Sequence, residues 1–208
     1  MTSSTWLGFF AVSWLISLSP GAGAVSCMTA GMRYGVKRGF WNILGLQTGI
    51  IAQVAICGLG LGAVLAASAT AFTAVKWCGA LYLCWLGITQ WRAPAERVTV
   101  NGRDEDGTPA ALYRRGVLVN LTNPKAVMFM LAVLPQFIDP HRPLWPQYAI
   151  CTLTLMLTDV VVMGAYTGLA AKVLLILRTP RQIRWINRTF GSLFVAAGLL
   201  LATFKRTA

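Results

Sequence analysis

Residues 118–137 read LVNLTNPKAVMFMLAVLPQF, an apolar stretch that is interrupted by the polar run Asn120–Lys125. Roughly 20 predominantly apolar residues cross a bilayer as a helix, so the stretch is long enough to be one span. Pro124 lacks an amide hydrogen and clashes with the carbonyl one turn earlier, which should interrupt the helix near mid-depth. Because broken backbone is tolerated in hydrocarbon only inside protein or beside a water-filled cavity, the stretch predicts a broken span that faces the protein interior.

The first apolar run of the chain carries a similar break. Ser17-Leu18-Ser19-Pro20 places polar side chains just before a proline, as Asn120-Leu121-Thr122-Asn123-Pro124 does. Packing bends could explain either proline alone, since proline is frequent in membrane helices. Two symmetric breaks instead indicate one internal site. The free amides that begin each second half-helix could receive a carboxylate there, which would suit an amino-acid substrate.

The composition indicates that lipid is the solvent. Of the 208 residues, 56% are hydrophobic and only 12% are charged, whereas soluble domains carry roughly a quarter charged residues. Six spans, which leave no room for a soluble domain, are predicted near residues 6–30, 41–66, 72–90, 116–137, 147–171 and 189–204. We therefore expect an all-α membrane protein in which residues 1–208 form a single transmembrane domain.

A polar, turn-rich segment separates three predicted spans from three. Residues 92–115 are expected to form a cytoplasmic linker between a first repeat, 1–91, and a second repeat, 116–208. Two such halves run through the membrane in opposite senses, as in an inverted-topology 3+3 transporter repeat. Two weak sequence correspondences between the halves match this repeat. The similar tetrapeptides GALY at 79–82 and GSLF at 191–194 are 112 residues apart, and so are Gln47 and Asp159.

Lysine and arginine give the chain a formal net charge of +12. They cluster in the first, third and fifth loops between the predicted spans, and cytoplasmic loops are enriched in these residues. The charge is therefore interpreted as a topology signal, and no nucleic-acid partner is expected. The pattern predicts a multi-pass protein of the bacterial inner membrane with both termini on the periplasmic side.

Two ionisable residues, Lys125 and Asp159, fall near the middle of predicted spans. A charge at that depth costs at least ~2.5–3.5 kcal/mol, and such residues usually pair with each other or line an ion path. A purely structural ion pair is one alternative. The other is that Asp159, balanced between burial and a nearby cation, accepts and releases protons during transport. Asp159 is thus the candidate proton-coupling residue.

Neutral polar side chains at similar depths could complete a small polar pocket. The residues predicted to bind substrate are Ser19, Pro20, Gly21, Gln47, Asn120, Asn123, Pro124 and Lys125. The cysteines lie inside apolar stretches without metal-ligand spacing, so no metal or cofactor is expected. Gly45 and Gly49 form a small-x-x-x-small pair that could bring helices together within the chain or between chains of a homo-oligomer.

Four stretches carry a resemblance to a known family: LSPGAGA at 18–24, LVNLTNPK at 118–125, LPQFI at 134–138 and FGSLF at 190–194. Together they resemble the lysine exporter (LysE/RhtB) family over nearly the whole chain. The family commonly has proline-glycine-proline where this chain has Pro20-Gly21-Ala22. The resemblance implies six spans in an inverted 3+3 arrangement. It also implies outward transport of small amino acids such as homoserine, homoserine lactone and threonine, driven by proton exchange.

The leading hypothesis is therefore an amino-acid/proton antiporter and not an enzyme, with the amino acid, protons and the lipid bilayer as its partners. An exporter of another amino acid, such as leucine or a basic amino acid, is the nearest alternative. An intramembrane thiol redox enzyme would need reactive cysteines in both halves, yet the fourth predicted span has none to match Cys27 of the first. A non-transporting membrane subunit would use the broken helices only to shape an interface.

Overall fold

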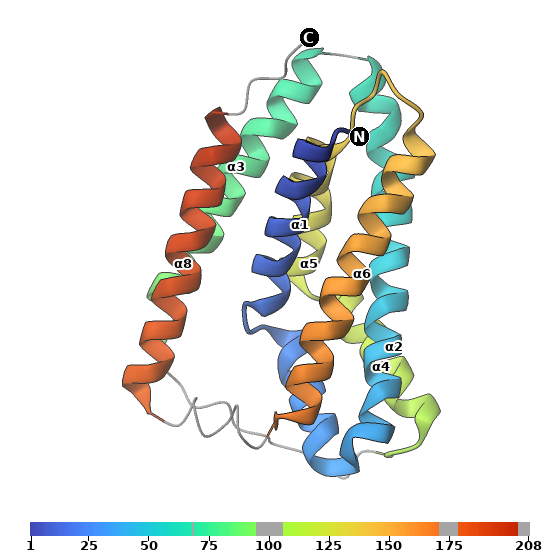
Figure 1. The fold of residues 1–208 in the computed structure, drawn as a ribbon, viewed down its shortest axis with the longest axis vertical. Coiled ribbons are helices and arrows are strands. Elements are labelled where there is room, and N and C mark those ends of the chain that lie inside the picture. Colours follow the sequence, from blue (N-terminus) through green and yellow to red (C-terminus); the bar gives the residue numbers. More distant parts are fainter. Residues whose placement is uncertain (68, 95–105, 171–178, 204–208) are drawn as a thin grey trace.

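The computed structural model describes residues 1–67, 69–94, 106–170 and 179–203. Within these ranges every regular element is a helix, and the helices lie side by side in an elongated bundle (Figure 1). The predicted all-α class is therefore confirmed.

The helices are apolar enough for a membrane. Ala22–Gly60, Leu144–Gly168 and Pro180–Thr203 each have the length and hydropathy of a span, and a bent pair, Pro109–Leu121 with Pro124–Phe137, adds a fourth. Exposed tryptophans occur near the ends of several helices, as they do at the interfaces of a bilayer. Trp6 and Trp145 lie in the first turns of α1 and α6, Trp91 in the last turn of α3 and Trp185 near the start of α8, while Trp77 and Trp85 are exposed within α3.

The first half of the chain contains α1 (Ser3–Leu18), α2 (Ala22–Ala67) and α3 (Ala69–Arg92). α2 consists of two helical parts that meet at Gly35, where φ is 76°. Glycine adopts this left-handed conformation at little cost, and the chain reverses there at the lower end of Figure 1. The part of α2 that precedes Gly35 therefore continues α1 beyond a short break, and the part that follows returns through the bundle.

The described part of the second half contains four α-helices and two short helical turns of other types. These are α4 (Pro109–Leu121), α5 (Pro124–Met128), the π-helical η1 (Phe129–Val133), the 3-10 helix η2 (Leu134–Phe137), α6 (Leu144–Gly168) and α8 (Pro180–Thr203). α4 runs from the lower end of Figure 1 to mid-height, and α5 continues from there toward the upper end.

Two predicted boundaries differ from the structure because capping residues begin helices inside polar sequence. Thr108 accepts a hydrogen bond from the Ala111 amide and Pro109 occupies the first turn, which suits a helix start. Residues 109–115, at the end of the predicted linker, thus form the first turns of α4, while residues 95–105 of the predicted linker lie outside the described residues. α8 begins at Pro180 and not near residue 189, because Thr179 and Gln182 form a reciprocal cap.

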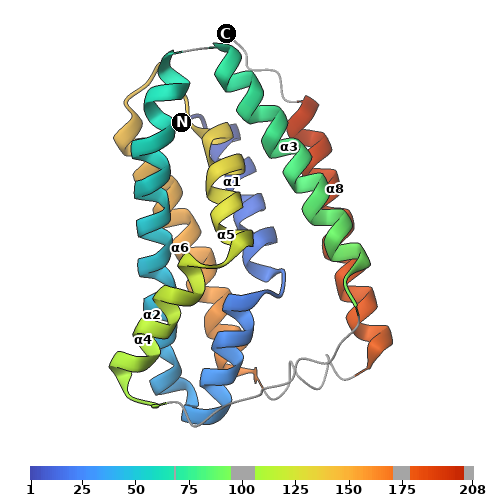
Figure 2. The same cartoon turned by 180° about the vertical axis from the view of Figure 1, so that it is seen from behind.

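Close contacts through glycine hold the bundle together. Gly45 of α2 lies against the backbone of α4 at Tyr113 and Gly116, and Gly49 lies against Asn120. The Gly45–Gly49 pair, which the sequence left open as a contact within or between chains, therefore packs within the chain. α3 and α8 form a separate pair at one side of the bundle (Figure 2), in contact through their backbones at Gly87 and Gly191.

Replacement of Gly45 should test this packing. In Gly45→Ala the added methyl group would overlap the Tyr113 carbonyl, and overpacking of this kind typically costs about 1–3 kcal/mol. We expect a lower apparent Tm in detergent, measured by loss of a folded-state fluorescence signal. Gly60→Ala in the same helix is the control, since nothing lies within 4 Å of the added group. Equal Tm values for the two variants would contradict the packing described.

Candidate functional site

The two helix breaks meet at the centre of the bundle. α1 ends at Leu18 with Ser19 as its C-cap, and α4 ends at Leu121 before α5 begins at Pro124. The bend between α4 and the segment after it is 52°. α1 and α5 lie beside each other in both views, so the breaks stand at a similar height. The structure therefore places both helix breaks in the interior of the bundle, and their role in one binding site stays a prediction.

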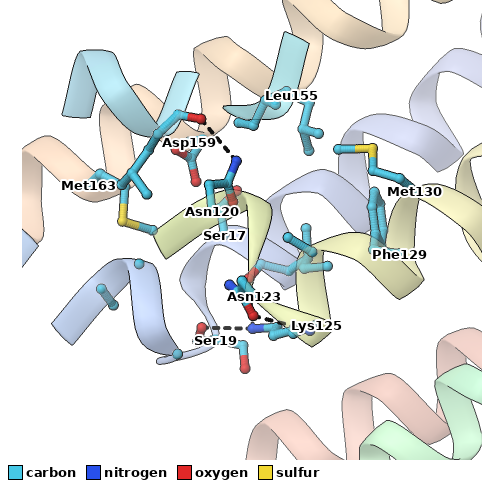
Figure 3. Close-up of a pocket in the computed structure, with 17 residues that line it drawn as sticks. Ser17, Ser19, Asn120, Asn123, Lys125, Phe129, Met130, Leu155, Asp159 and Met163 are labelled. Carbon is cyan, nitrogen blue, oxygen red and sulfur yellow. Dashed lines mark hydrogen bonds between the residues drawn. The ribbon is translucent and has the colours of Figure 1, made fainter. Parts of the chain in front are cut away.

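Lys125 joins the two breaks. Asn123 caps α5 by accepting from the Lys125 amide at 3.1 Å, and the Lys125 side chain reaches the end of α1. Its Nζ donates to the carbonyl oxygens of Ile16 at 3.0 Å and Ser19 at 2.9 Å (Figure 3). Carbonyls at a helix C-terminus have no intrahelical partner and carry the negative end of the helix dipole. The lysine of the second half thus satisfies the broken end of a helix in the first half.

Asp159 has a different kind of partner. It projects from α6, and its Oδ2 accepts a hydrogen bond from Gln47 Nε2 of α2 at 2.7 Å. Within the described residues, no ion pair joins Asp159 to Lys125, because the hydrogen bonds of the Lys125 ammonium go to carbonyl groups. The alternative that these two residues form a direct structural ion pair is therefore wrong. They act on each other only across the cavity between them.

That cavity has a volume of about 70 Å³. Its wall contains six of the nine residues that the sequence predicted for the site: Ser19, Gly21, Asn120, Asn123, Lys125 and Asp159. Pro20 and Pro124 shape the breaks and are not in the wall, and Gln47 reaches the site through Asp159. At ~10–15 Å³ per water, the volume corresponds to a few water molecules. The site is therefore small in this conformation and suits a solute of few atoms.

The apolar part of the wall was not predicted. Phe129, Met130, Leu155 and Met163 face the cavity, and Figure 3 shows them around the polar residues. In the sequence they are ordinary residues of apolar spans, so no local signal separates them from side chains that face lipid. They set the size of the cavity and lower its polarity.

Two buried polar atoms at the site lack partners. Ser19 Oγ and Gln47 Oε1 make no hydrogen bond within the described part of the chain. A buried unsatisfied group costs ~1–3 kcal/mol, so each requires an explanation. Asn120, in contrast, is hydrogen-bonded on both its side chain and its backbone. Its side-chain Nδ2 donates to Leu46 O and its backbone carbonyl accepts from Gln53 Nε2, each at 2.9 Å. Asn120 thus fixes α4 to α2, whereas Ser19 and Gln47 have capacity to spare.

The site offers carboxylate, ammonium, amide and hydroxyl groups but no metal-binding cluster. Among the described residues, no three histidine, cysteine, aspartate or glutamate side chains gather closely enough to hold a metal ion. The five cysteines are free thiols. The arrangement can bind a small polar solute and can take up a proton at Asp159.

Comparison with known proteins identifies the family. Residues 14–204 match the model of the LysE type translocators. The chain belongs to this family. It is 41% identical to a homoserine/homoserine lactone efflux protein of Salmonella typhimurium, with 99% of each chain covered. It is 42% identical to an uncharacterized membrane protein of Vibrio cholerae over 99% of this chain and all of the relative. A leucine efflux protein of Enterobacter sp. (strain 638) is 27% identical over 92% of each chain.

No solved structure matches the chain. The family match makes this LysE type translocator a membrane transport protein for amino acids and not an enzyme. The thiol redox alternative and the non-transporting subunit are thereby set aside.

The cap of α5 can be tested against a cap of similar chemistry elsewhere. Asn123→Ala should lower stability by ~0.5–2 kcal/mol and should also reduce transport strongly, because the cap orients Lys125. Thr2→Ala removes the N-cap of α1 at the end of the bundle, at a similar stability cost but far from the cavity. Apparent Tm and the initial rate of solute efflux would be measured for both. A loss of transport proportional to the loss of stability in both variants would contradict a special role for Asn123.

Proposed function

We propose that this translocator exports small amino acids, homoserine and homoserine lactone first and threonine next, in exchange for protons. The observation that carries the proposal is the cavity between two helix breaks, with a lysine at one side and an aspartate at the other. The homoserine/homoserine lactone efflux relative, at 41% identity over nearly the full length, supports the substrate class.

The charges of the cavity complement an amino-acid zwitterion. The positive N-terminal ends of α2 and α5, together with the Lys125 ammonium, would attract the substrate carboxylate. Ser19 Oγ, which is free to donate, and Asn123 at the cap of α5 lie in the same wall. Homoserine lactone has no free carboxylate, so Lys125 is not indispensable for every substrate of this transporter.

Asp159 would provide the coupling between substrate and proton. Because its hydrogen-bond partner is the neutral amide of Gln47, its negative charge can be neutralised by a proton or by the substrate ammonium, but not by both at once. Competition of this kind at one carboxylate is sufficient for antiport: a proton that arrives from outside displaces the substrate, and substrate inside displaces the proton.

The proposed architecture is a single domain of six spans, arranged as two inverted repeats, 1–91 and 116–208, around the linker 92–115. Antiparallel contacts between corresponding helices support it. Gln47 and Asp159, which are 112 residues apart, pair where α2 crosses α6. α3 and α8 meet at Gly87 with Gly191 and again at Ala80 with Gly198. A two-fold axis in the membrane plane would pass through both crossings.

The proposed location is the bacterial inner membrane, with both termini on the periplasmic side. The lower end of the bundle in Figure 1 contains the Gly35 turn, the end of α3 and the start of α8. Arginine and lysine residues concentrate in these segments, which supports a cytoplasmic position for this end. The start of α1 and the end of α8 lie at the opposite end.

Asp159→Asn should abolish proton-coupled efflux and leave the protein inserted, because asparagine keeps the shape of the side chain but cannot carry the proton. Purified protein in vesicles that contain homoserine would be assayed for efflux after a pH jump. Asp106→Asn, at an exposed turn before α4, is the matched control and should retain efflux. Wild-type coupling in Asp159→Asn would remove Asp159 from the mechanism.

The substrate class can be measured in cells that overexpress the chain. Growth tolerance and the extracellular concentrations of homoserine, threonine, leucine and lysine would be compared between the wild type and Asp159→Asn. We expect tolerance to homoserine and its lactone and accumulation of homoserine outside, with a smaller effect for threonine. Preferential export of leucine or lysine would instead support the nearest alternative, an exporter of another amino acid.

A further inference from the structure

The pair formed by Gln47 and Asp159 leaves half of an amide unused. Gln47 is 4% exposed, and its Nε2 donates to Asp159 Oδ2 at 2.7 Å. Its Oε1 has no hydrogen-bond partner within the described residues. Gln47 does not belong to the cavity wall, whereas Asp159 does. The unused oxygen therefore belongs to a residue that contacts Asp159 from outside the cavity wall.

An amide contains a donor group and an acceptor group of nearly the same shape. An ionised carboxylate only accepts hydrogen bonds, so it requires the Nε2 group. A protonated carboxyl has one donor hydrogen, which an amide oxygen can accept. Rotation of the Gln47 amide about its last side-chain torsion would exchange the two groups without any movement of the backbone.

The surroundings leave the choice of orientation to Asp159. Because Oε1 at the far end of the amide makes no hydrogen bond in the described part of the chain, rotation of the amide would break no other hydrogen bond of that oxygen. The backbone beneath it is fixed, since Gly45 and Gly49 on either side are packed against α4. The protonation state of Asp159 is thus the remaining determinant of the direction in which the amide points.

The charged and titratable groups around the pair come from three elements. Lys125 of α5 and Cys27 of α2 interact electrostatically with Asp159, and Arg115 of α4 acts on Cys27. α1, which also packs against α6, has no titratable side chain. These groups act on Asp159 through their charges, whereas the described side chain that hydrogen-bonds it is the neutral amide of Gln47.

We propose that Gln47 is a positioning residue for proton coupling, whose amide holds ionised Asp159 through Nε2 and turns to accept from protonated Asp159 through Oε1. This inference rests on the proposed role of Asp159 in antiport. One buried side chain then stabilises both protonation states in one place, so that Asp159 can exchange its proton without losing its position at the cavity.

The test compares two buried glutamines of the same helix. Gln53 resembles Gln47 in burial, at 6% exposed, and its Oε1 is also unpartnered. Its Nε2 donates to the Asn120 carbonyl, which does not titrate. The hydrogen bond to the ionised carboxylate is charge-assisted and is therefore stronger than the bond to the protonated form. In vesicles loaded with homoserine, Gln47→Met should thus raise the midpoint of the pH dependence of efflux by about one pH unit, a tenfold change in proton affinity. Gln53→Met should change the rate or the stability and leave the midpoint in place.

Several outcomes separate this inference from the proposed function. A wild-type protein whose homoserine efflux does not depend on pH would overturn the antiport and this inference with it. A pH-dependent wild type with an unmoved midpoint in Gln47→Met, or with equal shifts in both glutamine variants, would overturn the role of Gln47 alone.

A second measurement on the full chain does not depend on the folding of a Gln47 variant. Infrared difference spectra of the wild type across the pH range should show a carboxyl band and a glutamine amide band that change with one midpoint. Both changes should disappear in Asp159→Asn. A carboxyl band that titrates without any amide change would contradict the turning amide.

Discussion

The structure depends on the way in which two carbonyl groups are satisfied in the middle of a membrane. A break in a spanning helix exposes backbone groups that hydrocarbon cannot hydrogen-bond. At the end of α1 these groups are the carbonyls of Ile16 and Ser19, and both accept from Lys125 Nζ. The interaction satisfies the break and places the positive charge of the lysine at the negative end of a helix dipole. It also ties the first half of the chain to the second.

This use of Lys125 determines what Asp159 can do. A lysine and an aspartate inside a bundle would ordinarily pair with each other, and such a pair would neutralise both. Here the lysine is held by backbone carbonyls and the aspartate by an amide, with the cavity between them. A zwitterionic solute would find both of its charges complemented in that space. The separation of the two charges thus follows from the backbone geometry of the break.

Much of this arrangement could be predicted from the sequence, because breaks and intramembrane charges are local signals. Pro20, Pro124 and the two ionisable residues mark the predicted site without reference to tertiary structure. The sequence gives Gln47 and Asp159 the same 112-residue spacing as the similar tetrapeptides, but their hydrogen bond is seen only in the structure. The start of α8 was misplaced because its first turns carry arginines that hydropathy excludes. The partners of Lys125 could not be predicted, since backbone carbonyls have no sequence signature. The same holds for Phe129 and Met163, whose side chains are apolar like those that face lipid.

The two breaks correspond in sequence at Pro20 and Pro124, so that Gly21 corresponds to Lys125. The structure gives a physical reason for this difference between the halves. The first carbon of a side chain at Gly21 would be in ordinary van der Waals contact with Lys125, 3.8 Å from its Cδ and 4.0 Å from its Nζ, so a longer side chain would compete with the lysine for the space between the breaks. A second lysine at this position would put two like charges in one small space. The difference between the two proposed repeats at this pair therefore leaves one cation, Lys125, in the described cavity wall. The difference between Gln47 and Asp159 leaves one anion there.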